Sequence, residues 1–294
     1  MTALICLGLG YSAEHFVKVF GAKFDHIVGT VRSAERVAAL TADAGRLEAL
    51  VFDGKTATDE LRRAIAAADA ALISIPQDAA GDPVLRAFGD AFAQAPRLRA
   101  IVYLSTVGVY GDCGGAWVDE ATPAKSTSAR SRERLAAEAE WQALGARRGI
   151  GVAILRLAGI YGPGRSALTQ VKRGDARRIV KPGQVFNRIH VGDIAQAIDA
   201  AIACRAAGIF NVADDEPTPP GEPLAFAAQL LDVPPPPEIP FAQAAPAMSE
   251  LALSFWQECR RVKNDKLKHE LGVRLGYPTY REGLRALLNA GSAP

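Results

Sequence analysis

The residues Ala3–Lys18, with the sequence ALICLGLGYSAEHFVK, decide how the rest of this chain folds. An apolar run, Ala3–Leu7, leads into Gly8-x-Gly10-x-x-Ala13, and apolar residues then recur at helical spacing. Such a pattern predicts a buried strand, a tight turn and a helix.

This strand, turn and helix are typical of a dinucleotide-binding site. In such a site Gly8 allows the sharp turn, Gly10 lets the backbone approach a pyrophosphate, and a small residue at Ala13 lets the helix pack closely on the strand. The helix N-terminus offers unpaired N–H groups and a positive dipole end to the phosphates. We therefore expect Gly8, Gly10, Tyr11, Ser12 and Ala13 to contact a cofactor, although the same glycines also suit a purely structural turn.

The composition indicates an ordinary globular protein with no nucleic-acid or membrane partner. Its 294 residues suffice for one large core with a smaller lobe, or for two domains. With 49% hydrophobic and 22% charged residues, the chain differs from disordered and membrane proteins. The net charge is +2, basic residues are scattered, and no apolar stretch is long enough to cross a bilayer.

The cysteines and histidines give no sign of disulfides or of a metal site. The N-terminal apolar run has no preceding basic residue and enters the glycine turn directly, so we expect no secretory signal and a cytoplasmic location. The four cysteines form no CxxC pair, and the four histidines are equally dispersed. We expect reduced thiols and no metal.

The end of the second predicted strand, His26–Val31, is where the ribose of a dinucleotide would be recognised. NAD sites usually place an acid about twenty residues beyond the glycines, whereas NADP sites place an arginine there. Here the strand is followed by Arg32 and Ser33, which predicts NADP rather than NAD. Ser33 also suits the cap of the next helix, and Arg32 could instead be a solvated surface residue.

Strands and helices then alternate, which predicts a doubly wound parallel α/β sheet covered by helices on both faces. The further strands are expected at 49–52, 70–75, 100–104, 152–157 and 208–212. Ligands bind at the carboxyl ends of such strands, so Asp53, Ser74, Ile75 and Pro76 are candidate cofactor contacts. Asp53 suits a plain Asp-Gly turn equally well.

Four motifs in order resemble one known superfamily. They are the GxGxxA turn, YLSTVGVYGD at 103–112, RLAGIYGPGRS at 156–166 and NRIHVGDIA at 187–195. Together they resemble the extended short-chain dehydrogenase/reductase superfamily, in its NAD(P)-dependent epimerase/dehydratase group, and most closely its atypical branch with altered active-site residues. The resemblance spans most of the chain and implies a Rossmann-type fold.

The resemblance implies that Thr106, with Ser105 beside it, polarises a substrate carbonyl or alcohol. It also implies a catalytic Tyr with a Lys four residues later on the next long helix. Matching RLAAE in this chain to KLAAE in the family puts Arg134 at the Lys position and Arg130 at the Tyr position. Arg134 could still hold a ribose or phosphate, but the guanidinium of Arg130 stays charged and cannot shuttle a proton.

Other phenols could supply the missing proton transfer. Tyr161, Tyr110 and Tyr103 follow or lie in strands that end near the expected site, although each is equally suited to packing in the core. A basic stretch from 172 to 181 would suit an anionic substrate, the cofactor's phosphates or solvent.

We expect residues 1–163 and 187–213 to form the cofactor domain, and 164–186 and 214–294 a small, mostly helical lobe that faces the substrate. Asp193 is the expected cap of the helix at 194–204. Ala136, Ala139 and Ala143 form a small-residue stripe that suggests a homodimer or packing against the sheet.

These observations predict an oxidoreductase or epimerase that uses NADP on a sugar-nucleotide-like or other small carbonyl substrate. The candidate catalytic residues are Thr106, Arg130, Arg134 and Tyr161. The alternative is a protein that binds the nucleotide as a signal without turnover, which the arginines at the Tyr and Lys positions favour.

Overall fold

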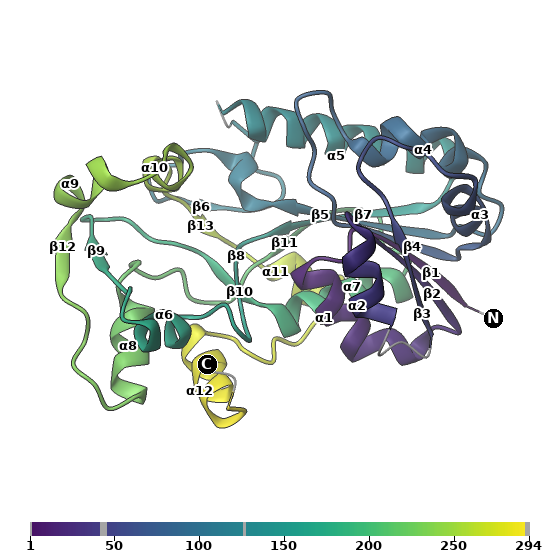
Figure 1. The fold of residues 1–294 in the computed structure, drawn as a ribbon. Helices are drawn as coiled ribbons and strands as arrows, with labels where there is room; N and C mark the ends of the chain where they lie inside the picture. The colour runs from purple at the N-terminus through teal and green to yellow at the C-terminus, as the bar shows by residue number, and fades with distance from the viewer. Residues whose placement is uncertain (1, 42–45, 126–127, 292–294) are drawn as a thin grey trace.

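The computed structural model describes residues 2–41, 46–125 and 128–291. Its centre is a sheet of seven parallel strands in the order β11-β7-β5-β4-β1-β2-β3 (Figure 1). These are β1 (Ala3–Leu7), β2 (His26–Val31), β3 (Leu47–Val51), β4 (Ala70–Ile73), β5 (Ala100–Thr106), β7 (Gly151–Leu157) and β11 (Gly208–Val212). The winding direction reverses between β1 and β4, where such sheets bind ligands. The predicted Rossmann-type fold is confirmed.

Helices cover both faces of the sheet, which explains why its strands are apolar throughout rather than alternating. One face carries α3 (Asp59–Ala67), α4 (Pro83–Gln94) and α5 (Ala129–Arg148). The other carries α1 (Tyr11–Phe20), α2 (Ala34–Thr41), α7 (Val191–Ala203) and α11 (Asp265–His269). Each helical layer encloses its own hydrophobic core cluster with the sheet. Within the described residues, no helix has both the length and the apolar character needed to cross a membrane.

Most predicted element boundaries agree with the structure to within two residues, and β1, β2 and β11 coincide with the predicted ranges. Strand β4 ends two residues earlier than expected, at Ile73, and β5 continues two residues further, to Thr106. Helix α4 is capped by Asp82, which accepts from the N–H groups of Val84 and Leu85 at 2.8 and 3.0 Å.

The predicted cap of α7 is wrong. The helix begins at Val191 and its cap is His190, whose Nδ1 accepts from the Gly192 N–H at 3.1 Å. Asp193 instead accepts from the N–H groups of Gly276 and Tyr277 at 2.7 and 3.1 Å. Its carboxyl thus ties the C-terminal segment to α7, and burial raises its pKa to about 6.

A smaller lobe lies beside the carboxyl ends of the central strands (Figure 1). Its core joins Tyr161 and Leu168 to three helices, α6 (Ala167–Arg173), α8 (Glu222–Leu230) and α12 (Tyr280–Asn289). Further short elements are η1 (Gly21–Lys23), η2 (Val107–Tyr110), η3 (Ala245–Ala247), α9 (Phe241–Ala244) and α10 (Glu250–Gln257).

The lobe also contains short parallel strand pairs, which the sequence analysis did not predict. They are β8 (Gly159–Tyr161) with β10 (Arg188–His190), β9 (Arg178–Val180) with β12 (Glu238–Pro240), and β6 (Trp117–Val118) with β13 (Arg261–Val262). The basic stretch from 172 to 181 includes the end of helix α6 and the whole of strand β9. Leu267 and Val273, assigned to the lobe, are instead buried in the main core.

The small-residue stripe on α5 faces outward. Ala136, Ala139 and Ala143 are exposed, whereas Ala137 and Trp141 on the opposite side of the helix are buried against the sheet. The stripe therefore does not pack on the sheet, and self-association through it stays a prediction.

If α5 forms a dimer interface, Ala139→Arg should convert a dimer into a monomer, because it places a large charge at close helix contacts. Sedimentation velocity at several concentrations measures this, with Ala66→Arg at an exposed alanine of α3 as the matched control. A wild-type protein that sediments as a monomer at high concentration would remove the prediction.

Candidate functional site

The turn between β1 and α1 needs glycine at its first position. Gly8 has a φ of +100°, and a Cβ there would stand 2.8 Å from side-chain atoms of both Ile75 and Ser74. Its N–H donates to Thr30 Oγ1 at 2.8 Å, and the Ser74 hydroxyl donates to its carbonyl. Gly8 therefore holds the ends of β1, β2 and β4 together at the point where the sheet reverses its winding.

Gly10 serves a different purpose, since no protein atom crowds it. It precedes α1 and provides no side-chain cap, and a Cβ built on it has no heavy atom within 4 Å. The open space lies in front of the first N–H groups of the helix. This geometry fits a pyrophosphate that approaches the backbone there.

The first residues of α1 have two different roles, because two of them are buried in the core and one contacts a neighbouring loop. Ala13 is fully buried and Ser12 is nearly so. Tyr11 is partly exposed, and its hydroxyl donates to the carbonyl of Pro163 at 3.0 Å. Tyr11 thus links the glycine turn to the loop that follows β8.

The residues expected at the ribose end lie near one another beyond β2. Arg32 is exposed, and the structure records no partner for its side chain within the described residues. Ser33 caps α2 by accepting from the Arg36 N–H at 3.4 Å, while the Arg36 guanidinium pairs with Glu14 at 2.6 Å. Arg32 is therefore the cation at this end that is available to a ligand phosphate.

The other rim candidates have local roles in the structure. Asp53 accepts from the N–H groups of Lys55 and Thr56, both at 2.8 Å, and these bonds lower the pKa of its exposed carboxyl. It therefore forms the turn that its Asp-Gly sequence allows. Ser74 and Ile75 are half-buried beside the glycine turn, and Pro76 is exposed.

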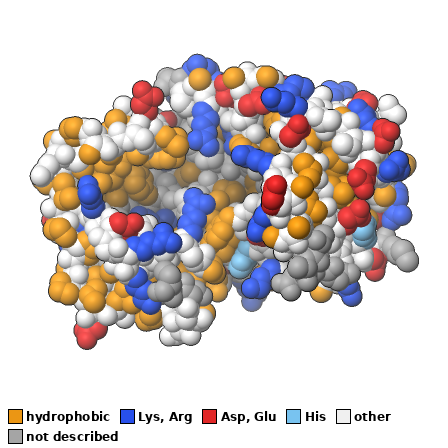
Figure 2. Space-filling model, in the orientation of Figure 1, with side chains coloured by type: hydrophobic (Ala, Val, Ile, Leu, Met, Phe, Trp, Pro, Cys, Tyr) orange, Lys and Arg blue, Asp and Glu red, His pale blue; other side chains and the backbone are white. Residues whose placement is uncertain are grey.

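A cavity of about 860 Å³ opens between the ends of β5 and β7 and the smaller lobe. Figure 2 shows it as the hollow at the centre of the visible face, with basic side chains around it. Its lining includes Thr106, Arg130 and Tyr161 from the predicted set. The glycine turn and Arg134 are outside this lining, so the structure divides the predicted site into two neighbouring parts.

The charges that line the cavity are mostly positive. Arg130, Arg165 and Arg173 are exposed at its mouth, and Arg188 and Arg260 lie deeper. Glu258 is the one acidic residue among the described residues that line it. The opposite wall is apolar and is formed by Val185, Pro223, Leu224, Phe255, Trp256 and Leu284.

The two hydroxyls at the end of β5 differ in their availability. Ser105 is buried and donates its proton to the carboxylate of Glu138. Thr106 Oγ1 accepts from the Gly108 N–H at 3.1 Å, and the structure records no acceptor for its own proton within the described residues. Because a hydroxyl can donate and accept at once, Thr106 retains a donor for a ligand in the cavity.

Arg130 and Arg134 are one helical turn apart but lie in different environments. Arg130 is exposed at the cavity mouth. Arg134 is only 7% exposed, and its Nη1 donates to the Tyr103 hydroxyl and the Leu104 carbonyl, both at 3.1 Å. The guanidinium of Arg134 is therefore held in the core beneath β5. Among the described residues, no hydrogen-bond partner is found for its Nε.

Each of the three tyrosines considered as proton donors has a hydrogen-bond partner for its hydroxyl other than Thr106. The Tyr110 hydroxyl donates to Asn211 Oδ1 at 2.8 Å, and burial raises the pKa of Tyr103 to about 12. Tyr161 reaches the cavity wall, but its hydroxyl donates to the Thr279 carbonyl at 3.3 Å. Burial, with Asp214 and Asp193 nearby, raises the pKa of Tyr161 as well.

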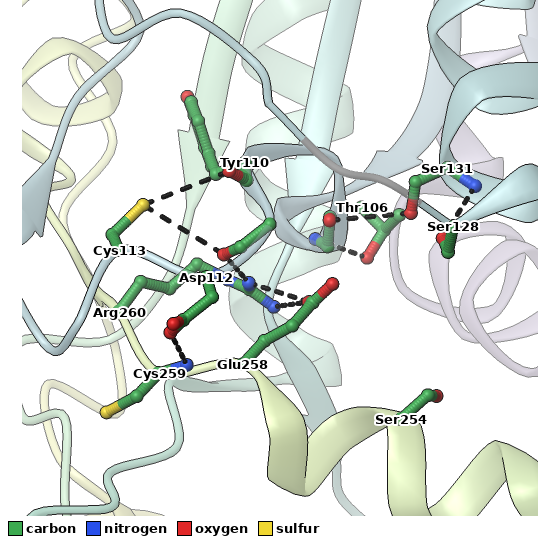
Figure 3. A network of polar contacts seen from close by, with 12 residues as sticks. Thr106, Tyr110, Asp112, Cys113, Ser128, Ser131, Ser254, Glu258, Cys259 and Arg260 are labelled. Atoms are coloured by element: carbon green, nitrogen blue, oxygen red, sulfur yellow. Dashed lines mark hydrogen bonds and ion pairs between the residues drawn. The ribbon is translucent and has the colours of Figure 1, made fainter.

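The sequence analysis did not predict a role for Glu258 and Arg260, which lie against the turn after Thr106 (Figure 3). Both terminal nitrogens of Arg260 donate to Glu258 Oε2 at 2.8 Å, and Arg260 Nη1 also donates to the carbonyl of Gly111, the residue that ends η2. No local motif marks Glu258 or Arg260, because the segment after α10 meets η2 only through the tertiary fold.

A family model described as the NAD dependent epimerase/dehydratase family matches residues 84–213. The structure of a functionally unknown conserved protein from Silicibacter pomeroyi DSS is 43% identical, with a TM-score of 0.89 and 99% of each chain covered. The structure of dTDP-glucose 4,6-dehydratase from Bacillus anthracis in complex with NAD has a TM-score of 0.78 at 16% identity, over 98% of this chain and 96% of that one. At that identity the likeness concerns the fold alone.

One curated relative, 3-diazoavenalumate denitrifying reductase from a Streptomyces species, is 28% identical over 217 residues. The match covers 70% of this chain and 65% of the relative. This chain therefore aligns with less than two thirds of that protein's length.

Proposed function

Since the chain belongs to the NAD-dependent epimerase/dehydratase family, we propose that it is an NADP-dependent oxidoreductase acting on a small carbonyl compound that carries an anionic group. The observation that carries the proposal is the Thr106 hydroxyl, which keeps a free donor at the edge of a basic cavity next to the glycine turn. The dehydratase neighbour contains NAD, and the curated relative is a reductase.

The residues of the glycine turn fit a nicotinamide dinucleotide. The open space at Gly10 and the uncapped N-terminus of α1 suit the pyrophosphate, and Arg32 and Ser33 suit the adenosine end. When bound, the nicotinamide ring supplies or accepts a hydride.

We expect NADPH to bind more tightly than NADH, because Arg32 offers an exposed cation and no acid stands at its position. A charge-assisted contact contributes about 1.5–3 kcal/mol, or about one to two decades in Kd. Calorimetric titration of both cofactors measures this, and Arg32→Ala should remove the preference while Arg63→Ala, at an exposed arginine of α3, keeps it. Equal affinities in the wild type would contradict the assignment.

In this proposal Thr106 binds the substrate oxygen. The Gly108 N–H orients Oγ1, so the Thr106 proton points to a carbonyl oxygen in the cavity and stabilises the negative charge that develops on it. Ser105 does not compete for the substrate, since its proton is bound to Glu138.

The walls of the cavity support a substrate that has an anionic group and an apolar part. The arginines attract a carboxylate or phosphate, and Arg188, which is half-buried, lies deeper than the arginines at the mouth. Phe255, 56% exposed at the opposite wall, offers an apolar surface that a substrate would cover.

The test is turnover of bound NADPH by stopped-flow absorbance with a panel of acceptors. We expect reduction of aromatic aldehydes that carry a carboxylate, such as 4-carboxybenzaldehyde, and slow or no turnover of UDP-glucose and dTDP-glucose. Thr106→Val should lower kcat by about 100-fold, the effect of removing one oxyanion donor. Tyr161→Phe should change kcat little, because its hydroxyl is bonded to Thr279.

A second function is favoured by one specific observation, namely that the hydroxyls of Tyr103, Tyr110 and Tyr161 each have a hydrogen-bond partner other than Thr106. A protein that binds the nucleotide without turnover would show tight NADPH binding and no reaction with any acceptor in the panel. Fast turnover that Tyr161→Phe abolishes would instead assign proton transfer to Tyr161.

A further inference from the structure

Glu258 is the one acidic residue among the described residues that line this cavity, and the other charged residues of the lining are arginines. It comes directly after α10, and Gln184 Nε2 donates to its backbone carbonyl at 2.8 Å. Its Oε2 accepts from both terminal nitrogens of Arg260 at 2.8 Å. Arg260 in turn donates to the Gly111 carbonyl, so the pair is attached to the turn that starts at Thr106.

The second carboxyl oxygen of Glu258 remains available. The structure records no hydrogen bond to Oε1 within the described residues. Figure 3 shows the carboxyl extending toward the Thr106 hydroxyl, and both residues line the same cavity. A carboxyl group fixed through one oxygen and open through the other is arranged to exchange a proton with a bound ligand.

The surroundings of Glu258 shift the pKa of its carboxyl upward. Burial raises the pKa of this carboxyl above its usual value. The Arg260 guanidinium lowers it and the Asp112 carboxylate at the end of η2 raises it further. Proton transfer is most efficient when the donor's pKa lies near the working pH, and this shift moves Glu258 in that direction.

We propose that Glu258 is the catalytic residue that exchanges a proton with the substrate oxygen held by Thr106, in the role that the missing tyrosine would have. In reduction, the carbonyl carbon accepts a hydride from the bound reduced dinucleotide, and the carbonyl oxygen accepts the proton of Glu258 Oε1. The product is an alcohol, the dinucleotide is left oxidised, and the Glu258 carboxylate regains a proton from solvent through the open cavity. Alcohol oxidation reverses each transfer, with the carboxylate as the base.

Arg260 acts as a positioning residue in this scheme. Its bonds to Oε2 and to the Gly111 carbonyl keep Glu258 over the turn, and its positive charge stabilises the carboxylate that remains after the proton has left. An arginine suits this role because it stays charged throughout.

This inference rests on the proposed function, and its test uses the reduction of 4-carboxybenzaldehyde and the reverse oxidation of 4-(hydroxymethyl)benzoate by the full-length protein. Glu258→Gln should lower kcat by about 100-fold or more in both directions, in line with acid/base catalysis, while the Kd for NADPH stays unchanged. Glu258→Asp should recover part of the rate. Glu250→Gln, at an exposed glutamate of α10, is the matched control.

The pH dependence gives an independent signature. Reduction needs the protonated carboxyl, so its rate should fall as pH rises through the pKa of Glu258, whereas oxidation should rise over the same range. In Glu258→Gln, the pH dependence of both rates should disappear. Without any cofactor, ¹³C NMR of protein labelled at glutamate Cδ should show a resonance that titrates above the usual glutamate range and is missing in Glu258→Gln. Burial also raises the pKa of Glu120, so the loss of the resonance in Glu258→Gln makes the assignment.

The outcomes separate this proposal from the one it rests on. If Glu258→Gln turned over as fast as the wild type, with the same pH dependence in both directions, the role of Glu258 would be overturned. The proposal that the protein is an oxidoreductase would then remain. A wild type that binds NADPH but reduces no carbonyl acceptor would overturn both. A Glu258 resonance that titrates in the ordinary range would also count against the proposal.

Discussion

Gly10→Val is expected to abolish NADPH binding while the protein remains folded. A Cβ at Gly10 has no protein atom within 4 Å, so the larger side chain finds room in the free protein. The same space is where a pyrophosphate would meet the N-terminus of α1, and valine would fill it. A loss of at least about 100-fold in affinity, or about 2.8 kcal/mol, is expected by calorimetry.

The control for this prediction is Gly89→Val in α4, where an added Cβ also meets no atom within 4 Å. This variant should bind NADPH as the wild type does. Gly8→Val should lose NADPH binding for a different reason, because the protein should unfold. The φ of +100° at Gly8 strains any other residue, and a Cβ there would lie 2.8 Å from side-chain atoms of Ile75 and Ser74. A folded Gly10→Val that binds NADPH normally would make the turn purely structural.

Glu138→Ala should destabilise the fold by about 3–5 kcal/mol, because it leaves the Arg156 guanidinium buried without its partner. The side chains of Arg156 and Glu138 are only 4% and 3% exposed, and they meet at 2.7 Å. Ser105 would also lose the acceptor of its proton. Urea unfolding followed by circular dichroism measures the free energy of unfolding.

Glu140→Ala is the matched control, because Glu140 is exposed on the same helix two residues further along. A surface change of this kind usually stays within about 0.5 kcal/mol. If the two variants had equal stability, the buried pair would contribute nothing to the fold.

Local patterns were sufficient to predict the central architecture. The strand, glycine turn and helix of Ala3–Lys18, and the alternation that follows, depend on residues a few positions apart, since backbone conformation and the periodicity of burial are set over that range. The resulting parallel sheet then places all strand ends on one edge. The glycine turn followed from the same local pattern, whereas Thr106 was assigned from the resemblance to a known family.

The tertiary structure decided how the side chains at that edge are used. Ser105 and Thr106 are adjacent in sequence, yet Glu138 binds the proton of one and leaves that of the other free. Arg134 matches a family position, yet packing turns its guanidinium to Tyr103 in the core.

Glu258 illustrates what the sequence by itself leaves undetermined. Nothing near it in the chain distinguishes it from other glutamates. It reaches the turn after Thr106 because hydrogen bonds from Arg260 to the Gly111 carbonyl and from the Cys259 N–H to Asp112 hold its segment there. Contacts between segments so far apart depend on how the lobe packs against the sheet, and no short-range pattern encodes that packing. The sequence therefore determined the fold and the place of the site, and the tertiary contacts decided which residues are available to act in it.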